Sequence, residues 1–380
     1  MIGFGRAAAG IAACTLLCAS LTGCFETISG SESSGGIWEG IEPVAEGEFG
    51  EPKYADGVYM TQTVKEPAKN PYAEDTKQVK TGETADGIRY ALYEKHAEIT
   101  GHSDDFSAEI LELPAELEGL PVTAVADVQC GESIFDIDKN GAFYGCYTLE
   151  KVVVPEGYLR IGNYGFYGCK NLKSVQIAET VTQIGDRAFA MCSGLRELSV
   201  PSGIDTIGDS AFSLTPWYDN LLYHRDFVIF NGRLYDVGRR CEGEMIVPDY
   251  VVSIGDYAFY SCPNVKAIVL PESVKTVGAY AFCNCPALRS VVFLNPECEI
   301  CDDVTTLSNK PDDGDQDFYH GTVYGKAGSS AEQFAKKYKF QFADIAEYQA
   351  PDPEPETQKT TAETTEAAKE ETETTAAADS

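Results

Sequence analysis

Residues 178–200 read AETVTQIGDRAFAMCSGLRELSV, and this stretch contains the pattern that determines the fold. Near its end Leu198 and Val200 alternate with the polar residue Ser199. A period of two is typical of a β-strand with one buried face. Pro201 follows directly and ends the strand, because proline has no amide proton for a β-ladder.

The middle of the same stretch predicts a turn that brings an aromatic side chain into the core. Gly185 suits a tight turn with positive φ, and Asp186 can cap the short turn that carries Phe189 inward. A single unit of this size cannot bury its own apolar face. The unit therefore has to stack on copies of itself.

Such copies are present. The repeated phenylalanines are 23 residues apart, with one gap of 47 residues before the last two: Phe143, Phe166, Phe189, Phe212, Phe259 and Phe282. Cysteines keep the same period at Cys146, Cys169, Cys192, Cys262 and Cys285. We therefore expect a solenoid with one parallel β-strand in each 23-residue rung and short helical or irregular turns on the other side.

Two of the units carry a more specific signature. Residues 161–169, IGNYGFYGC, and 254–262, IGDYAFYSC, resemble the BspA-type leucine-rich repeats of bacterial surface proteins. The likeness covers roughly residues 86–345 and implies a curved leucine-rich-repeat solenoid that binds host proteins, other cells or glycans. We place the solenoid at residues 85–345, with an insertion at 131–140 and irregular rungs at 215–247.

The N-terminal residues predict export. An apolar run follows Arg6 and ends in residues 21–24, LTGC, which resembles the lipobox of bacterial lipoproteins. The resemblance implies a signal peptide at residues 1–23 and a lipid on the thiol of Cys24, whereas an ordinary signal peptide with a chance cysteine is the alternative. The run is too short to span a bilayer by itself.

Composition separates the solenoid from its flanks. Residues 24–84 are rich in Gly, Ser, Glu, Pro and Lys, so we expect a disordered tether there. Residues 346–380 are rich in Thr, Glu and Ala and predict a disordered acidic tail. The formal net charge of the chain is −31, which excludes nucleic acid as an expected partner because binding it requires clustered Lys and Arg.

Little in the sequence predicts catalysis or a cofactor. The four histidines, His96, His102, His224 and His320, are scattered. The loops 136–141 and 313–317 alternate acidic residues, but each lacks part of a calcium-binding pattern, and a solvated acidic loop is the preferred interpretation. The CxxC at 298–301 has no second pair to complete a zinc site. The repeated cysteines predict buried free thiols, with disulfides between rungs as the alternative.

Two sets of residues are candidates for ligand binding. The first polar strand position of successive rungs forms a basic row of Lys173, Arg196, Lys266 and Arg289, which could meet an anionic partner or merely balance neighbouring acids. Trp217, Tyr218 and Tyr223 fall in the irregular rungs, where they either contact a sugar or peptide or refill the core.

The sequence thus predicts a non-enzymatic surface lipoprotein that mediates adhesion or ligand binding. It would be extracytoplasmic, anchored to the cell membrane through its N-terminal lipid and monomeric. Its expected partners are host or bacterial surface proteins or glycans, and no metal or cofactor is expected. A structural or assembly scaffold of the cell envelope is the alternative function.

Overall fold

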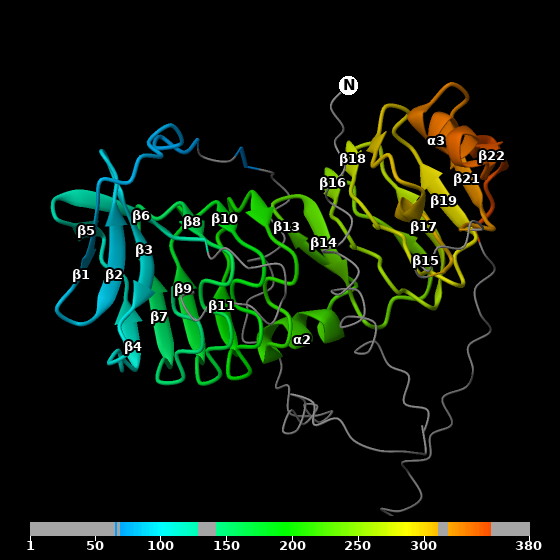
Figure 1. Cartoon of the computed structure of the whole chain (residues 1–380). Helices are drawn as coiled ribbons and strands as arrows, with labels where there is room; N and C mark the ends of the chain where they lie inside the picture. The colour runs from blue at the N-terminus through cyan, green and yellow to red at the C-terminus, as the bar shows by residue number, and fades with distance from the viewer. Residues whose placement is uncertain (1–64, 67–68, 128–141, 311–317, 351–380) are drawn as a thin grey trace, which may run out of the picture.

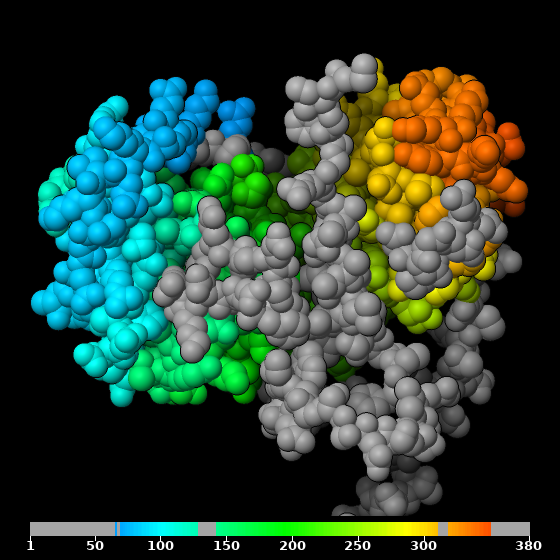
Figure 2. Space-filling view, in the orientation of Figure 1, coloured from blue at the N-terminus to red at the C-terminus, as the bar shows by residue number. Residues whose placement is uncertain are grey.

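The computed structural model describes residues 65–66, 69–127, 142–310 and 318–350. Strands dominate these ranges, and they stack along the molecule from the N-terminal rungs to the C-terminal rungs (Figure 1). The two groups of rungs lie at opposite ends of the particle (Figure 2). No helix within these ranges combines the length and the apolar character that crossing a bilayer requires.

Each regular rung contributes two parallel strands. The longer strands of the N-terminal rungs form one sheet, in the order β11 (Glu197–Ser199), β9 (Ser174–Ile177), β7 (Lys151–Val154) and β4 (Ile110–Glu112). The shorter strands β8 (Arg160–Ile161), β10 (Gln183–Ile184) and β12 (Thr206–Ile207) pair in parallel in a second sheet. The register joins residues 23 positions apart, since Val175 pairs with Leu198 and Ile184 with Ile207.

The parallel solenoid predicted from the sequence is confirmed, and the second strand of each rung adds to it. Residues 183–184 form only a two-residue strand, which is too short to produce a readable alternation of polar and apolar residues. A regular rung therefore has a second narrow sheet in addition to the predicted short turns, which follow the short strand.

The phenylalanines form columns inside the stack. Ring centroids are 5.1 Å apart between Phe143 and Phe166, 5.4 Å between Phe166 and Phe189, and 6.2 Å between Phe189 and Phe212. All four side chains are fully buried in one core. The backbone supports the same stacking, because the amide of Phe166 donates to the carbonyl of Ala188 in the next rung at 2.8 Å.

The turn before each phenylalanine differs from the expectation for Gly185. This glycine does not have positive φ; the left-handed residue is Arg187, with φ of 51°. Gly185 is required for a different reason, since a Cβ there would lie 2.5 Å from the amide nitrogen of Asn163 in the preceding rung. The repeated glycine thus lets neighbouring rungs approach each other closely.

Asp186 also has a different role from the predicted cap. Its Oδ1 accepts a hydrogen bond from the amide of Asp209 at 2.9 Å, and Asn163 Oδ1 accepts from the amide of Asp186 at 2.7 Å. Asp256 repeats the contact with Ala279 at 2.7 Å. A side chain of one rung therefore satisfies a backbone amide of the next along this edge of the solenoid.

An antiparallel cap covers the N-terminal end of the stack. Its strands are β1 (Lys80–Glu83), β2 (Ile88–Leu92), β3 (Ala97–His102), β5 (Glu116–Leu117) and β6 (Leu120–Val125). β1 pairs with β2, and β3 leads in parallel through β6 to β8, so the cap joins the sheet of short strands.

The predicted tether at 24–84 is therefore partly folded. β1 lies within it, and Asp75 Oδ2 is 3.0 Å from Nδ1 of the buried His96. The backbone of Lys65 is bound on both sides by the side chain of Asn231, which accepts from its amide at 2.7 Å and donates to its carbonyl at 3.0 Å. Composition missed these contacts because each depends on a partner distant in the sequence.

The regular stack is interrupted after Phe212. Helix α2 (Pro216–His224) begins with the Thr215 hydroxyl accepting from the amide of Tyr218 and lies beside β11 (Figure 1). An antiparallel hairpin of β13 (Phe227–Phe230) and β14 (Arg233–Val237) follows. β14 then starts a new parallel sheet with β16 (Ser253–Ile254), β18 (Thr276–Val277) and β20 (Glu299–Ile300).

Strand β13 separates two hydrophobic cores. Val228 and Phe230 pack in the core of the N-terminal rungs, whereas Ile229 between them packs in the core of the C-terminal rungs. Successive side chains of a strand point to opposite faces, so a strand with both faces buried can separate one core from the next.

The C-terminal rungs end in a second cap. Their longer strands form one sheet in the order β15 (Gly243–Ile246), β17 (Val265–Leu270), β19 (Ser290–Phe293), β21 (Thr322–Gly325) and β22 (Gln341–Asp344). The 3₁₀ helix η1 (Val304–Thr306) lies between β20 and β21, and η2 (Ile345–Glu347) follows β22. Helix α3 (Ser330–Tyr338) places Phe334 and Ala335 in the last part of the core.

The described repeat cysteines are buried and unbridged. Instead of pairing, Cys169 Sγ contacts the carbonyl of Phe143 at 3.0 Å, and Cys192 Sγ contacts that of Phe166 at 3.1 Å. Burial raises the pKa of Cys169 well above its ordinary value. These thiols therefore act as small core side chains with weak hydrogen bonds between rungs.

The phenylalanine column yields a stability prediction. We expect Phe166→Ala to destabilise the protein by about 3–5 kcal/mol, because it removes a fully buried ring that contacts both neighbouring rings. Urea denaturation followed by circular dichroism measures the change. Gln176→Ala on the exposed side of β9 is the control and should stay within about 0.5 kcal/mol. Equal stabilities of the two variants would contradict a shared phenylalanine core.

Candidate ligand-binding face

The predicted basic row is split into two pairs. Lys173 and Arg196 are consecutive on the N-terminal rungs, where the amide of Arg196 donates to the carbonyl of Lys173 at 3.0 Å. Lys266 and Arg289 are consecutive on the C-terminal rungs and are joined by the equivalent bond at 2.8 Å. The irregular rungs lie between the pairs, so the four cations do not form one continuous row.

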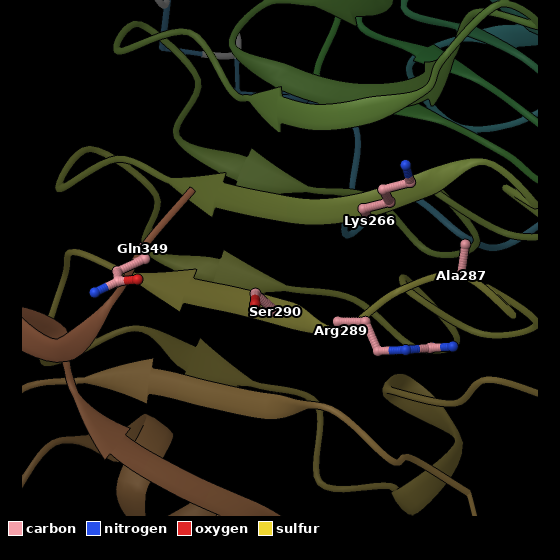
Figure 3. Close-up of a pocket in the computed structure, with 5 residues that line it drawn as sticks. All are labelled: Lys266, Ala287, Arg289, Ser290 and Gln349. Carbon is pink, nitrogen blue, oxygen red and sulfur yellow. The ribbon is translucent and has the colours of Figure 1, made fainter. Parts of the chain in front are cut away.

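The two pairs have different surroundings. Lys173 Nζ lies 2.7 Å from Glu150 Oε1, an exposed ion pair that neutralises one charge of the first pair. Lys266 and Arg289 line an open hollow of about 420 Å³ on the C-terminal rungs, together with Ala287, Ser290 and Gln349 (Figure 3). The guanidinium of Arg289 also donates to the carbonyls of Pro286 and Leu288 at 2.9 and 3.0 Å. The second pair thus combines two cations with a hollowed surface.

The hollow lies on the outer face of the sheet formed by β15, β17, β19, β21 and β22, and this face carries apolar residues. Val291 and Phe293 of β19 point into the core, so Val292 between them points outward. Val269 of β17 points outward likewise, and Ile246 on the edge strand β15 is 63% exposed. The corresponding residue of the N-terminal sheet is polar and exposed at Gln176.

The chain itself crosses this outer face after β22. The ring of Tyr348 lies 5.1 Å from that of Tyr324 on β21, and its hydroxyl donates to Glu244 Oε1 on β15 at 2.6 Å. These two strands are the fourth and the first of the sheet, so Tyr348 passes over the strands between them. This crossing accounts for the burial of the outward-pointing Val292, which is 1% exposed.

Burial raises the pKa of the Tyr348 phenol above its ordinary value, and the hydrogen bond to Glu244 raises it further. The phenol therefore stays protonated and can donate to Glu244 throughout the physiological pH range. The C-terminal segment is thus fastened across the sheet by one aromatic contact and one charge-assisted hydrogen bond.

Two of the three predicted aromatic residues are buried. Trp217 and Tyr218 are 2% and 8% exposed and pack on Phe212 at centroid distances of 5.0 and 6.2 Å. The burial of these two side chains agrees with the alternative interpretation, in which they refill an irregular core, and ligand binding by Tyr223 stays a prediction. Tyr223 is partly exposed, and the guanidinium of Arg240 lies 4.1 Å from its ring centroid.

The family comparison fits the geometry of the rungs. A family model described as BspA type leucine rich repeat region matches six copies, at residues 128–224 and 242–305. The repeats are BspA-type leucine-rich repeats. A leucine-rich-repeat solenoid generally serves as a non-catalytic scaffold that binds other proteins. A search of curated proteins found no match.

Several solved structures are similar to this leucine-rich-repeat chain. A leucine-rich repeat protein of T. pallidum is 21% identical, with 69% of this chain and 98% of that chain covered and a TM-score of 0.33. A leucine rich cell surface protein of Faecalibacterium prausnitzii is 16% identical over 71% and 96%, with a TM-score of 0.26. The pneumococcal vaccine antigen PcpA is 12% identical over 71% and 99%, with a TM-score of 0.28.

The other chemical candidates remain without a site in the described ranges. No group of three or more His, Cys, Asp or Glu residues there could hold a metal ion. Cys298 of the CxxC is buried, and burial raises its pKa to about 12. The loops 136–141 and 313–317 lie outside the described residues, as does Cys24.

Sequence reasoning missed the apolar outer face and its crossing segment. One signal was present, because β17 and β19 contain the uninterrupted apolar runs 267–270 and 291–293, whereas a strand with one solvated face alternates. Nothing in the composition around Tyr348 indicated that this residue packs on a sheet. Its nearest neighbours, Glu347 and Gln349, are polar.

Asp236 in the irregular rungs generates a pH prediction. Its carboxylate accepts from the hydroxyl of Tyr218 and from the amide of Val237, but burial raises its pKa to about 6 from the ordinary 3.8. Since the folded-state pKa is raised, its stabilising contribution is present below pH 3.8 and is lost as the pH rises through 6.

We therefore expect Asp236→Asn to raise the melting temperature at pH 7.5 and to lose this advantage at pH 4. An amide keeps the contact with Tyr218 and carries no buried charge. Thermal unfolding at the two pH values measures the difference. Asp205→Asn removes an exposed carboxylate and is the matched control. An equal effect of both substitutions at pH 7.5 would rule out a buried-charge penalty at Asp236.

Proposed function

We propose that this protein is an extracytoplasmic lipoprotein that binds an acidic partner through the hollow lined by Lys266 and Arg289. The partner is an anionic segment of a host or bacterial surface protein or glycan, and the binding serves adhesion or ligand capture. The observation that carries the proposal is the pairing of these two cations with an open hollow on a partly apolar sheet face.

Charge supports this assignment. The chain has a formal net charge of −31, so its surface repels most anions. A local pair of cations at rung spacing allows only those anions to bind that present their charges in a matching arrangement. The apolar residues of the same face, such as Ile246, provide buried contact area for a protein partner.

The location is supported by the sequence alone. The apolar run after Arg6 and the LTGC of residues 21–24 resemble a lipoprotein signal and predict a lipid on Cys24. A lipid-anchored protein with a repeat scaffold can present its binding face away from the membrane. This arrangement suits adhesion.

Charge reversal at the hollow tests the binding site. We expect Lys266→Glu combined with Arg289→Glu to weaken binding to host matrix proteins or anionic cell-wall polymers by about tenfold or more, equal to about 1.4 kcal/mol. Surface plasmon resonance with the purified chain against a panel of these probes measures the affinities.

Lys173→Glu combined with Arg196→Glu is the matched control, since it makes the same charge change on the N-terminal rungs. The control variant should retain most of the binding. Equal losses of affinity in both double variants would show that binding depends on net charge and not on the hollow. Absence of binding to every probe by the unaltered chain would refute the proposal.

The anchor is tested separately. We expect Cys24→Ala to abolish incorporation of a labelled fatty acid and to move the protein from the membrane fraction to the soluble fraction, because the acceptor thiol is lost. Metabolic labelling and fractionation of the expressing bacterium measure both effects. Cys130→Ala is the control. Unchanged labelling of the Cys24 variant would exclude lipidation at this residue.

A further inference from the structure

The acidic C-terminal tail begins at the edge of the ligand-binding hollow. Gln349, close to the end of the described chain, is one of the five residues that line the hollow, and Lys266 and Arg289 are two of the others (Figure 3). The chain reaches this place because Tyr348 is fastened between Tyr324 and Glu244 on the outer face of the sheet. The following residues therefore start on the same face as the two cations.

The charge of the tail complements the hollow. Residues 347–380 contain ten acidic residues and two lysines. The first acidic residues after Gln349 are Asp352, Glu354 and Glu356, within seven positions of it. Seven residues in an extended proline-rich conformation span roughly 22 Å, enough to reach any point of a hollow of this size.

The spacing of these carboxylates also fits. Residues 351–356 read PDPEPE, so proline separates the acidic residues and favours a polyproline II conformation. Alternate residues of such a chain are about 6 Å apart. Lys266 is on β17 and Arg289 directly precedes the adjacent parallel strand β19, so their backbones are about 4.8 Å apart, and both side chains are long enough to adjust.

We propose that residues 351–356 of the tail occupy the hollow and bind Lys266 and Arg289 as an internal ligand. The tail then competes with the external acidic partner, so the protein binds that partner only when its affinity or local concentration is high enough to displace the tail. The competition rests on the proposed function, whereas the contact between the tail and the hollow does not depend on any external partner.

Zero-length cross-linking of the full chain tests the contact. A carbodiimide joins a lysine amine directly to a carboxylate with loss of water, so it reports only pairs in direct contact. We expect a cross-link from Lys266 to Asp352, Glu354 or Glu356, detected by mass spectrometry of the monomer at low protein concentration. Its yield should fall several-fold in 1 M salt, because exposed ion pairs are screened.

The same sample contains an internal standard. Lys173 Nζ lies 2.7 Å from Glu150, so this pair should cross-link regardless of the tail. If Lys173 is linked to Glu150 while Lys266 is linked only to Glu244 or to no residue, the internal-ligand proposal is overturned. Cross-links from Lys266 to the tail found only between two molecules would overturn it as well.

A charge swap adds a second test. Changing Asp352, Glu354 and Glu356 to Lys should abolish the cross-link, and combining these changes with Lys266→Glu and Arg289→Glu should restore it with reversed polarity. The tail variant should also bind an anionic wall polymer several-fold more tightly than the unaltered chain. Loss of the cross-link with unchanged polymer binding would refute competition, whereas failure of the polymer to bind either protein would count against the proposed function alone.

Discussion

The stacking of identical backbone turns at a distance of one β-ladder is the constraint on which the rest of the structure depends. Neighbouring rungs approach so closely that a Cβ at Gly185 would overlap the backbone of the preceding rung. The same closeness places the phenylalanine rings 5.1 to 6.2 Å apart. It also lets Asp186 and Asn163 satisfy amides of the next rung. Backbone hydrogen bonds, side-chain hydrogen bonds and aromatic packing therefore all repeat with one period.

The interruption shows how such a stack tolerates an irregular segment. Helix α2 takes the place of a long strand, and Trp217 and Tyr218 continue the packing on Phe212 where the regular phenylalanine and cysteine are missing. Strand β13 then closes one core and opens the next, because both of its faces are buried. The cost of this arrangement is the carboxyl of Asp236, whose pKa burial raises to about 6.

The two long-strand sheets have the same construction and different outer faces. The N-terminal sheet presents the polar Gln176 and an ion pair between Lys173 and Glu150, and its apolar outward residues are Val153 and the edge residue Ile110. The C-terminal sheet presents apolar residues, a crossing segment fastened by Tyr348, and a hollow with two cations. One repeat can carry different outer faces, since the outward positions do not contribute to the core.

Periodicity in the sequence was enough to predict the repeat, the parallel stacking and the buried positions of the regular rungs. These follow from short-range periodicity, because each rung repeats the same apolar positions at an interval of 23 residues. Tertiary structure decided everything that depends on residues distant in the chain. It folded Asp75 against His96 within the predicted tether and buried Trp217 and Tyr218. It also divided the predicted basic row into two pairs and brought Gln349 beside Lys266. No local sequence pattern encodes these long-range contacts, since they form only when separate rungs and the chain ends pack together.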